Sequence, residues 1–156
     1  MTQAEFAGRV VAMQDTLYRV SATILPQLCD REDAVQGAIE KALAKRGSLR
    51  DDRALNKWLV RILINECYAL LRKRKRETLF SDPPEWELAA DANPNLYQLF
   101  TSLAEKYRLP MVLYYVEGYT VEEIAGMMKL PQGTLKSRLH RGRQLLRENL
   151  ELEEVR

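Results

Sequence analysis

The residues with the clearest chemical potential lie near the C-terminus. Between Gly133 and Glu148 the chain carries five Lys or Arg side chains and no acidic one, whereas acids return at once from Glu148 onward. A solvated helix face usually mixes the two signs. Cationic side chains bind phosphates, and arginine also binds guanine through two hydrogen bonds. This stretch therefore predicts contact with a polyanion, and a solvated helix with a Lys/Arg bias is the plainer alternative.

These cations belong to a predicted helix with a single apolar stripe. The stripe residues, at spacings of four and three, are Leu135, Leu139, Gly142, Leu146 and Leu150. The polar side chains opposite or flanking the stripe include Thr134, Lys136, Ser137, Arg138, His140, Arg141 and Arg143. At the helix start, the amides of Gln132, Gly133 and Thr134 can hold a phosphate.

A short amphipathic helix precedes this one. Thr120 and Glu123 form a capping box at its start. A tight turn at residues 129–130 follows, and Pro131 suits the first position of the final helix. The two helices predict a helix-turn-helix, with residues 131–147 as the recognition helix.

A second cationic cluster lies in the N-terminal half. The run RKRKR, residues 72–76, ends a helix predicted from about residue 53, where the helix dipole favours positive charge. The predicted buried face of this helix consists of Leu55, Trp58, Leu59, Ile62, Leu63 and Leu70. Asn65 offers a donor and an acceptor to a base edge. A plain surface amide at Asn65 and a solubilising role for the basic run are equal alternatives on chemistry alone.

Two more helices are predicted before this one. The first buries a stripe that ends before Pro26 and consists of Phe6, Val10, Met13, Leu17, Val20 and Ile24. The second is predicted to be capped by Asp30, and its stripe consists of Val35, Ala38, Ile39 and Ala42. Cys29 and Cys67 are isolated and are expected to be buried free thiols.

Charge and proline content divide the chain into three parts. Residues 1–76 carry a net charge of +6, residues 77–95 carry −5 with no base and three prolines, and residues 96–156 carry +1. The middle part reads as a flexible acidic linker. Pro110 falls near a helix start or at a kink. No strand pattern is present, so the predicted fold is all-α, with two small helical domains at 1–76 and 96–156.

Composition excludes several classes of function. The chain has 156 residues, 46% hydrophobic and 29% charged, with short apolar runs that predict no membrane insertion. The N-terminus lacks signal-peptide character, which indicates a cytoplasmic protein. There is one histidine and no metal-ligand cluster, phosphate loop or nucleophile–base spacing. We therefore expect no enzyme activity, no cofactor, no metal and no catalytic residue.

Two long stretches together carry a family resemblance. DREDAVQGAIEKAL and RALNKWLVRILINECYALLRKRKR resemble region 2 of bacterial RNA polymerase sigma factors. YTVEEIAGMMKLPQGTLKSRLHRGRQLLRENL is similar to their region 4. With only these two regions and a short link, the chain resembles the extracytoplasmic-function (ECF) group. Gly37, Leu49 and Ala69 depart from common family residues.

The resemblance implies roles for individual residues. Contacts to the minus-35 promoter element fall on Gln132, Gly133, Thr134, Lys136, Ser137, Arg138, His140, Arg141 and Arg143. Contacts to the minus-10 element and its melted strand fall on Leu49, Arg61, Asn65, Arg72, Lys73, Arg74 and Lys75. Contacts to core RNA polymerase fall on Asp33, Val35, Gln36, Ile39 and Glu40.

The implied partners are core RNA polymerase, promoter DNA as duplex and melted strand, and an anti-sigma factor, with the protein at the nucleoid during initiation. The alternative function is a stand-alone helix-turn-helix regulator, which would bind duplex DNA without polymerase. That alternative leaves the charge pattern of residues 1–76 unexplained.

Overall fold

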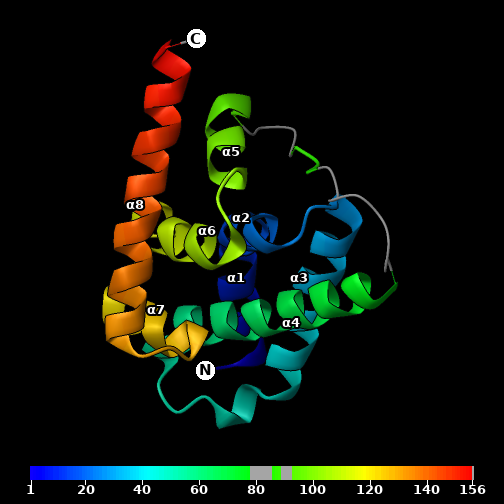
Figure 1. Cartoon of the computed structure of the whole chain (residues 1–156). Helices are drawn as coiled ribbons and strands as arrows, with labels where there is room; N and C mark the ends of the chain where they lie inside the picture. The colour runs from blue at the N-terminus through cyan, green and yellow to red at the C-terminus, as the bar shows by residue number, and fades with distance from the viewer. Residues whose placement is uncertain (78–85, 89–92, 156) are drawn as a thin grey trace. The chain divides into compact units, whose positions relative to one another are not determined.

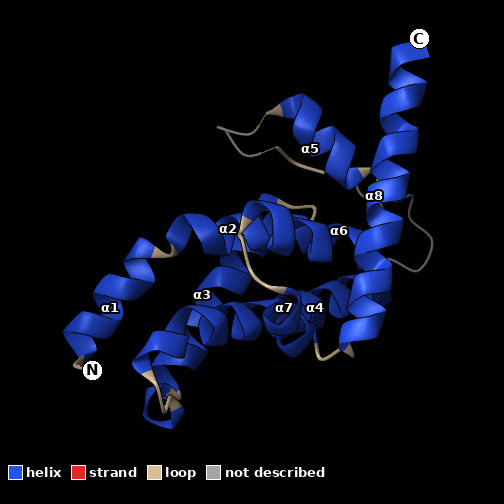
Figure 2. Cartoon of the chain, turned by 90° about the vertical axis from the view of Figure 1, so that its left-hand side faces the viewer, coloured by secondary structure: helices blue, strands red, loops and turns tan. Residues whose placement is uncertain are grey.

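A computed structural model describes residues 1–77, 86–88 and 93–155 of the chain. These residues form helices and connecting segments, with no strand among them (Figure 2). They divide into two compact units, Met1–Glu85 and Trp86–Arg156 (Figure 1). The prediction of an all-α chain with two helical parts is therefore confirmed. The division falls inside the predicted linker, and the predicted domain boundaries stay a prediction.

The first unit consists of the helices α1 (Gln3–Ala12), α2 (Gln14–Ile24), α3 (Leu28–Ala44) and α4 (Leu55–Glu77), with short 3-10 turns at Arg46–Ser48 (η1) and Asp52–Ala54 (η2). The first predicted helix is divided at Met13, but its whole apolar stripe is buried. Leu25 is extended, as expected of a residue before proline, and ends α2.

Helix α4 packs against both α2 and α3. The small residues Ala34, Ala38 and Ala42 of α3 are buried, and small side chains let two helices approach closely. The buried residues of α4 are Leu55, Leu59, Val60, Leu63, Ile64 and Cys67. Trp58, Ile62 and Leu70, which were predicted to be buried, are only half-buried. Leu55, Leu59 and Leu63 confirm half of the predicted face. The buried sector extends toward Val60, Ile64 and Cys67 instead of Trp58 and Ile62, because α4 packs against both α2 and α3.

The start of α3 also differs from the prediction. Gln27 is the residue before the helix, and its side chain makes no capping bond. Asp30 lies in the first turn and is only 3% exposed, so it is not the cap. Cys29 is exposed, which contradicts its predicted burial, whereas Cys67 is buried as predicted. Burial raises the pKa of the Cys67 thiol well above its ordinary value.

The second unit consists of α5 (Pro94–Thr101), α6 (Glu105–Met111), the π-helical turn η3 (Val112–Val116), α7 (Val121–Met128) and α8 (Gln132–Val155). Pro94, predicted to lie in the linker, begins α5, where proline is favoured. Pro110 lies inside α6, and the π-helical turn begins two residues later. Proline cannot donate the regular helical hydrogen bond, so a change in helical geometry near it is expected.

Helix α8 packs against α5, α6 and α7. Leu135 and Leu139 are buried, as predicted, but Leu150 is 47% exposed. That part of the predicted stripe is wrong because α8 continues to Val155. Among the described helices of the second unit, α5 is the one that lies beside the C-terminal half of α8 (Figure 2). There, Asn149 donates a 2.9 Å side-chain hydrogen bond to the Ser102 hydroxyl.

The contact between α8 and α6 depends on Gly142. A Cβ atom at this position would lie 2.9 Å from Cγ and 3.0 Å from Sδ of Met111, closer than real Cβ contacts. The two helices therefore touch through the glycine backbone. By contrast, a Cβ at Gly126 of α7 would meet no atom within 4 Å.

We expect Gly142→Ala to destabilise the second unit by about 1–2 kcal/mol, because the clash with Met111 outweighs the gain in helix propensity. Gly126→Ala is the matched control and is expected to stabilise by about 0.5–1 kcal/mol. Urea unfolding of the full chain, followed by circular dichroism, measures both. A Gly142→Ala variant as stable as the parent would contradict the packing described here.

Candidate nucleic-acid interfaces

The turn between α7 and α8 is tight and well defined. Thr120 and Glu123 form the predicted capping box at the start of α7, with hydrogen bonds of 3.1 and 3.2 Å. Lys129 ends α7 in the left-handed conformation, with φ of 56°, and the Leu130 amide donates to the Ala125 carbonyl at 3.0 Å. Helix α8 begins at Gln132, two residues after Leu130, so the predicted helix-turn-helix is confirmed.

Helix α8 has a buried side and a polar side. Leu135, Leu139 and Gly142 lie on the buried side, and Arg138 is half-buried beside them. The predicted binding residues that are exposed are Gln132, Gly133, Thr134, Lys136, Ser137, His140, Arg141 and Arg143. The amides of residues 132–134 precede the first intrahelical bond, which Leu135 donates to Pro131. The structure thus brings the predicted minus-35 residues together on one helix.

Two arginines of this surface have polar neighbours. Arg143 Nη1 donates to the Tyr115 hydroxyl at 3.2 Å. Arg141 Nη1 lies 3.4 Å from Gln144 Oε1 and 3.9 Å from Glu148 Oε1. Ion pairs this exposed contribute little, so a phosphate or base edge can replace the acceptors at small cost. Tyr115 lies 28 residues away in sequence, and no local pattern indicated its contact with Arg143.

In the first unit, Asn65 and Arg61 are exposed on α4. They are four residues apart and therefore lie on the same face of the helix. Leu49 is half-buried in the loop of residues 45–54, which joins α3 to α4. Asn65 offers an amide, Arg61 a cation and Leu49 an apolar side chain, which are the groups that suit an unstacked base and its phosphate.

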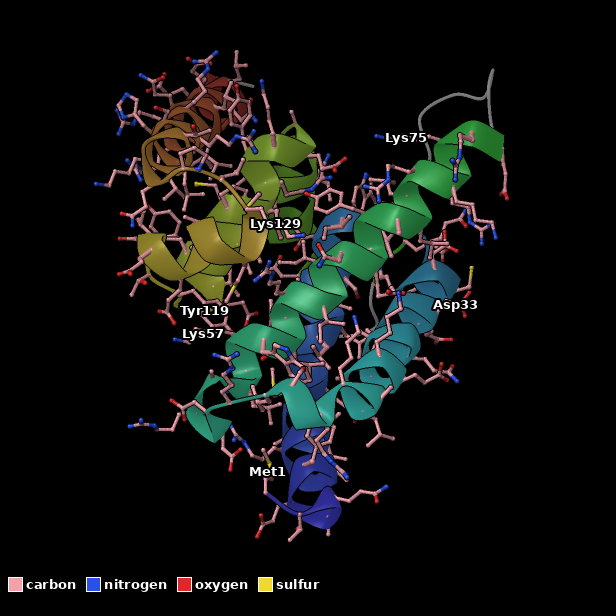
Figure 3. The ribbon with its side chains drawn as sticks, turned by 90° about the horizontal axis from the view of Figure 1, so that it is seen from below. Met1, Asp33, Lys57, Lys75, Tyr119 and Lys129 are labelled. Atoms are coloured by element: carbon pink, nitrogen blue, oxygen red, sulfur yellow. The ribbon has the colours of Figure 1, made fainter. Side chains whose placement is uncertain are left out.

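The cationic end of α4 is divided between two roles. Arg72, Lys73 and Lys75 are exposed. Arg74 instead donates to the buried carboxylate of Asp30 at 2.8 Å and to Glu77 at 3.1 Å. Figure 3 shows α3 beside α4, with Lys75 near one end of α4 and Lys57 near the other. The ion pair therefore joins the start of α3 to the end of α4.

These hydrogen bonds raise the pKa of the Arg74 guanidinium above its ordinary value, and the bond to Asp30 has the larger effect. The two residues are 44 positions apart, and no local sequence pattern indicates this pairing. Arg74 thus has a structural role, unlike the exposed cations Arg72, Lys73 and Lys75 of the same run.

The predicted polymerase-binding residues of α3 likewise include both exposed and buried side chains. Asp33, Gln36 and Glu40 are exposed and Ile39 is half-buried. Val35 is only 2% exposed and belongs to the hydrophobic core, so its assignment to the binding surface was wrong.

The unusual glycine of α3 has a neighbour on α4. A Cβ at Gly37 would lie 3.1 Å from Glu66 Oε2. The Glu66 carboxylate also pairs with Lys41 of α3. A side chain at position 37 would crowd this pair, which gives a packing reason for glycine there.

Among the described residues, no group of His, Cys, Asp and Glu side chains has the arrangement of a metal site. None of the helices in the described part of the chain has the length and apolar character needed to cross a membrane.

The two helical units and the cationic helix-turn-helix define a class of DNA-binding protein. Residues 10–77 match the family model for sigma-70 region 2, and residues 94–146 match that for sigma-70 region 4. The ECF RNA polymerase sigma factor SigW of Bacillus subtilis is 28% identical, covering 95% of this chain and 90% of its own. The RNA polymerase sigma-E factor of Streptomyces coelicolor is 30% identical, covering 94% and 86% respectively.

A solved structure agrees with these matches. The sigma factor RpoE of Bartonella quintana, crystallised with the anti-sigma factor NepR, superposes with a TM-score of 0.82 at 28% identity, covering 94% of this chain and 97% of RpoE. The chain belongs to the sigma factors of bacterial RNA polymerase, in the ECF group. It is therefore a transcription initiation factor, and the alternative of a stand-alone regulator is set aside.

We expect Asp30→Asn to lower the melting temperature of the first unit by about 5 °C, because the amide cannot accept all the hydrogen bonds from Arg74. Asp33→Asn, an exposed aspartate of the same helix, is the matched control and is expected to leave the melting temperature unchanged. Thermal unfolding of the full chain measures both. Equal melting temperatures for the two variants would show that the pair with Arg74 does not hold α3 to α4.

Proposed function

We propose that the second unit recognises the minus-35 element through α8. The observation that carries this proposal is the single exposed cationic face on the second helix of a helix-turn-helix. Arg138 and Arg141 are one turn apart and can reach guanine edges. Lys136, Ser137 and His140 contribute further base or phosphate contacts. Gln132, Gly133, Thr134 and Arg143 bind the phosphate backbone at the helix start and along its side.

The first unit captures the minus-10 element and its melted strand. Asn65 hydrogen-bonds an extruded base, and Leu49 packs against it from the loop. Arg61, Arg72, Lys73 and Lys75 bind the phosphates of the strand. Unstacking a base costs a few kcal/mol, and such a combined polar and apolar pocket returns that free energy.

Core RNA polymerase binds the exposed surface of α3 formed by Asp33, Gln36, Ile39 and Glu40. Residues 1–76 and 96–156 act as the two DNA-binding domains, and the acidic segment 77–95 links them without contacting DNA. The chain performs no reaction of its own, because the polymerase supplies the catalytic site. It acts in the cytoplasm, at the nucleoid during initiation.

An anti-sigma factor regulates the protein. The support is that RpoE of Bartonella quintana, to which this chain is similar over nearly its whole length, was crystallised with such a partner. Reconstitution with core RNA polymerase and run-off transcription from a randomised promoter library test the proposed function as a whole. Transcripts that begin at the same places with and without the protein would contradict it.

We expect Arg138→Ala and Arg141→Ala each to weaken recognition of the upstream element by about 1–3 kcal/mol, because each removes a base-edge contact. Arg147→Ala is the control, since Arg147 is an exposed arginine further along α8 and outside the proposed contacts. Footprinting of the holoenzyme measures protection of the minus-35 region. An unchanged footprint in both variants would contradict the assignment of the recognition helix.

We expect Asn65→Ala to slow strand opening by about tenfold or more while leaving initial duplex binding nearly unchanged, because the amide meets the base only after it is unstacked. Gln14→Ala, an exposed amide of α2, is the control. Permanganate reactivity reports opening, and a gel shift at low temperature reports duplex binding. Equal loss in the two assays would refute the role of Asn65.

A further inference from the structure

Arg9 of α1 bonds to a segment of the first unit that lies more than forty positions away in the sequence. Its Nη1 donates to the backbone carbonyl of Asp52, and its Nη2 donates to Oδ1 of Asn56 at 3.2 Å. Asp52 begins the turn η2, and Asn56 lies in the first turn of α4. One guanidinium from α1 therefore binds both the end of the loop and the adjoining first turn of α4, and ties this junction to α1.

The chemistry of this bridge requires arginine. A guanidinium presents several N–H donors in a rigid plane, so it reaches two acceptors at once in a fixed geometry. A lysine ammonium is a single point of charge on a flexible stem and cannot fix the two acceptors relative to each other. The Asp52 carbonyl also accepts the Leu55 amide, so both of its lone pairs are used.

The loop of residues 45–54 is also fixed by bonds within itself. The Leu49 amide donates to the Arg46 carbonyl at 3.2 Å. Asp51 Oδ1 accepts from the backbone amide of Arg53 at 3.0 Å. That amide, together with the Arg53 side chain, lowers the pKa of Asp51. These bonds set the shape of the loop, whereas Arg9 and the buried Leu55 tie it to the rest of the unit.

The loop carries Leu49 and α4 carries Asn65, so two walls of the proposed base pocket come from different elements. We propose that Arg9 is a positioning residue for the melted-strand site, which holds the Leu49 loop in place against α4 without touching DNA itself. This inference rests on the proposed function of that surface. A pocket discriminates between bases only if its walls stay within about 0.5 Å of the productive geometry.

The test uses holoenzyme reconstituted from the full chain and core RNA polymerase, with a promoter library randomised in both elements. We expect Arg9→Gln to reduce base preference at the minus-10 position read by Leu49 and Asn65 by about three- to tenfold, the effect of losing a hydrogen bond. Preference in the minus-35 element and affinity for core polymerase are expected to be unchanged. Arg9→Lys is expected to fall between Arg9→Gln and the parent.

Asn56→Leu provides a second route to the same result, because it removes the α4 acceptor and leaves Arg9 in place. It is expected to flatten the same minus-10 position. Arg19→Gln, an exposed arginine of α2, is the matched control and is expected to leave every preference unchanged. If Arg9→Gln does not fold, Asn56→Leu and Arg9→Lys still carry the test.

Leu49→Ala and Asn65→Ala variants, tested in parallel, distinguish a failure of the Arg9 positioning role from a failure of the proposed base pocket. If they flatten one minus-10 position but the Arg9 and Asn56 variants do not, the positioning role is overturned and the proposed function stands. A uniform loss of transcription with unchanged base preferences means that Arg9 only stabilises the fold, which also overturns the inference. If Leu49→Ala and Asn65→Ala alter no minus-10 preference, the proposed pocket and the role of Arg9 both fail.

Discussion

The contact between Gly142 of α8 and Met111 of α6 fixes how the recognition helix is rotated about its axis. The two helices meet through the glycine backbone, because even one added carbon would overlap the Met111 side chain. Leu135 and Leu139 are then buried on the same side. Since successive residues of a helix are separated by about 100°, a shift of one position would turn cations toward the hydrophobic core. The packing that stabilises the unit therefore also determines which side chains of α8 are exposed.

In the first unit, a buried charge constrains how α3 and α4 pack together. Asp30 is buried at the start of α3, and a buried carboxylate needs a partner. Arg74 supplies it from the end of α4. One cation of a basic run is thus used to hold two helices together, while its neighbours Arg72 and Lys73 are exposed. A run of like charges in a sequence does not show which cation pairs with a buried carboxylate and which cations are exposed. Mutations of the two kinds of residue nevertheless have different consequences.

Local features were predictable because their causes lie within a few residues. The capping box of Thr120 and Glu123 needs only one turn of helix. The alternation of buried and exposed positions around Leu135 and Leu139 follows from helix geometry alone. The exposed position of Leu150 was not predictable in this way, nor was the half-buried position of Trp58. Both depend on where a neighbouring helix ends or lies, and the apolar residue type is the same in either case.

The sequence alone determined that the chain is helical, that it has two parts, and that its last helix presents cations after a tight turn. These properties follow from side-chain periodicity, proline positions and charge, all of which act over short distances. The tertiary structure alone decided the pairings of Asp30 with Arg74 and of Arg9 with Asp52 and Asn56. Those contacts join residues more than forty positions apart, so they exist only after the helices have packed and brought the two ends of each pairing together.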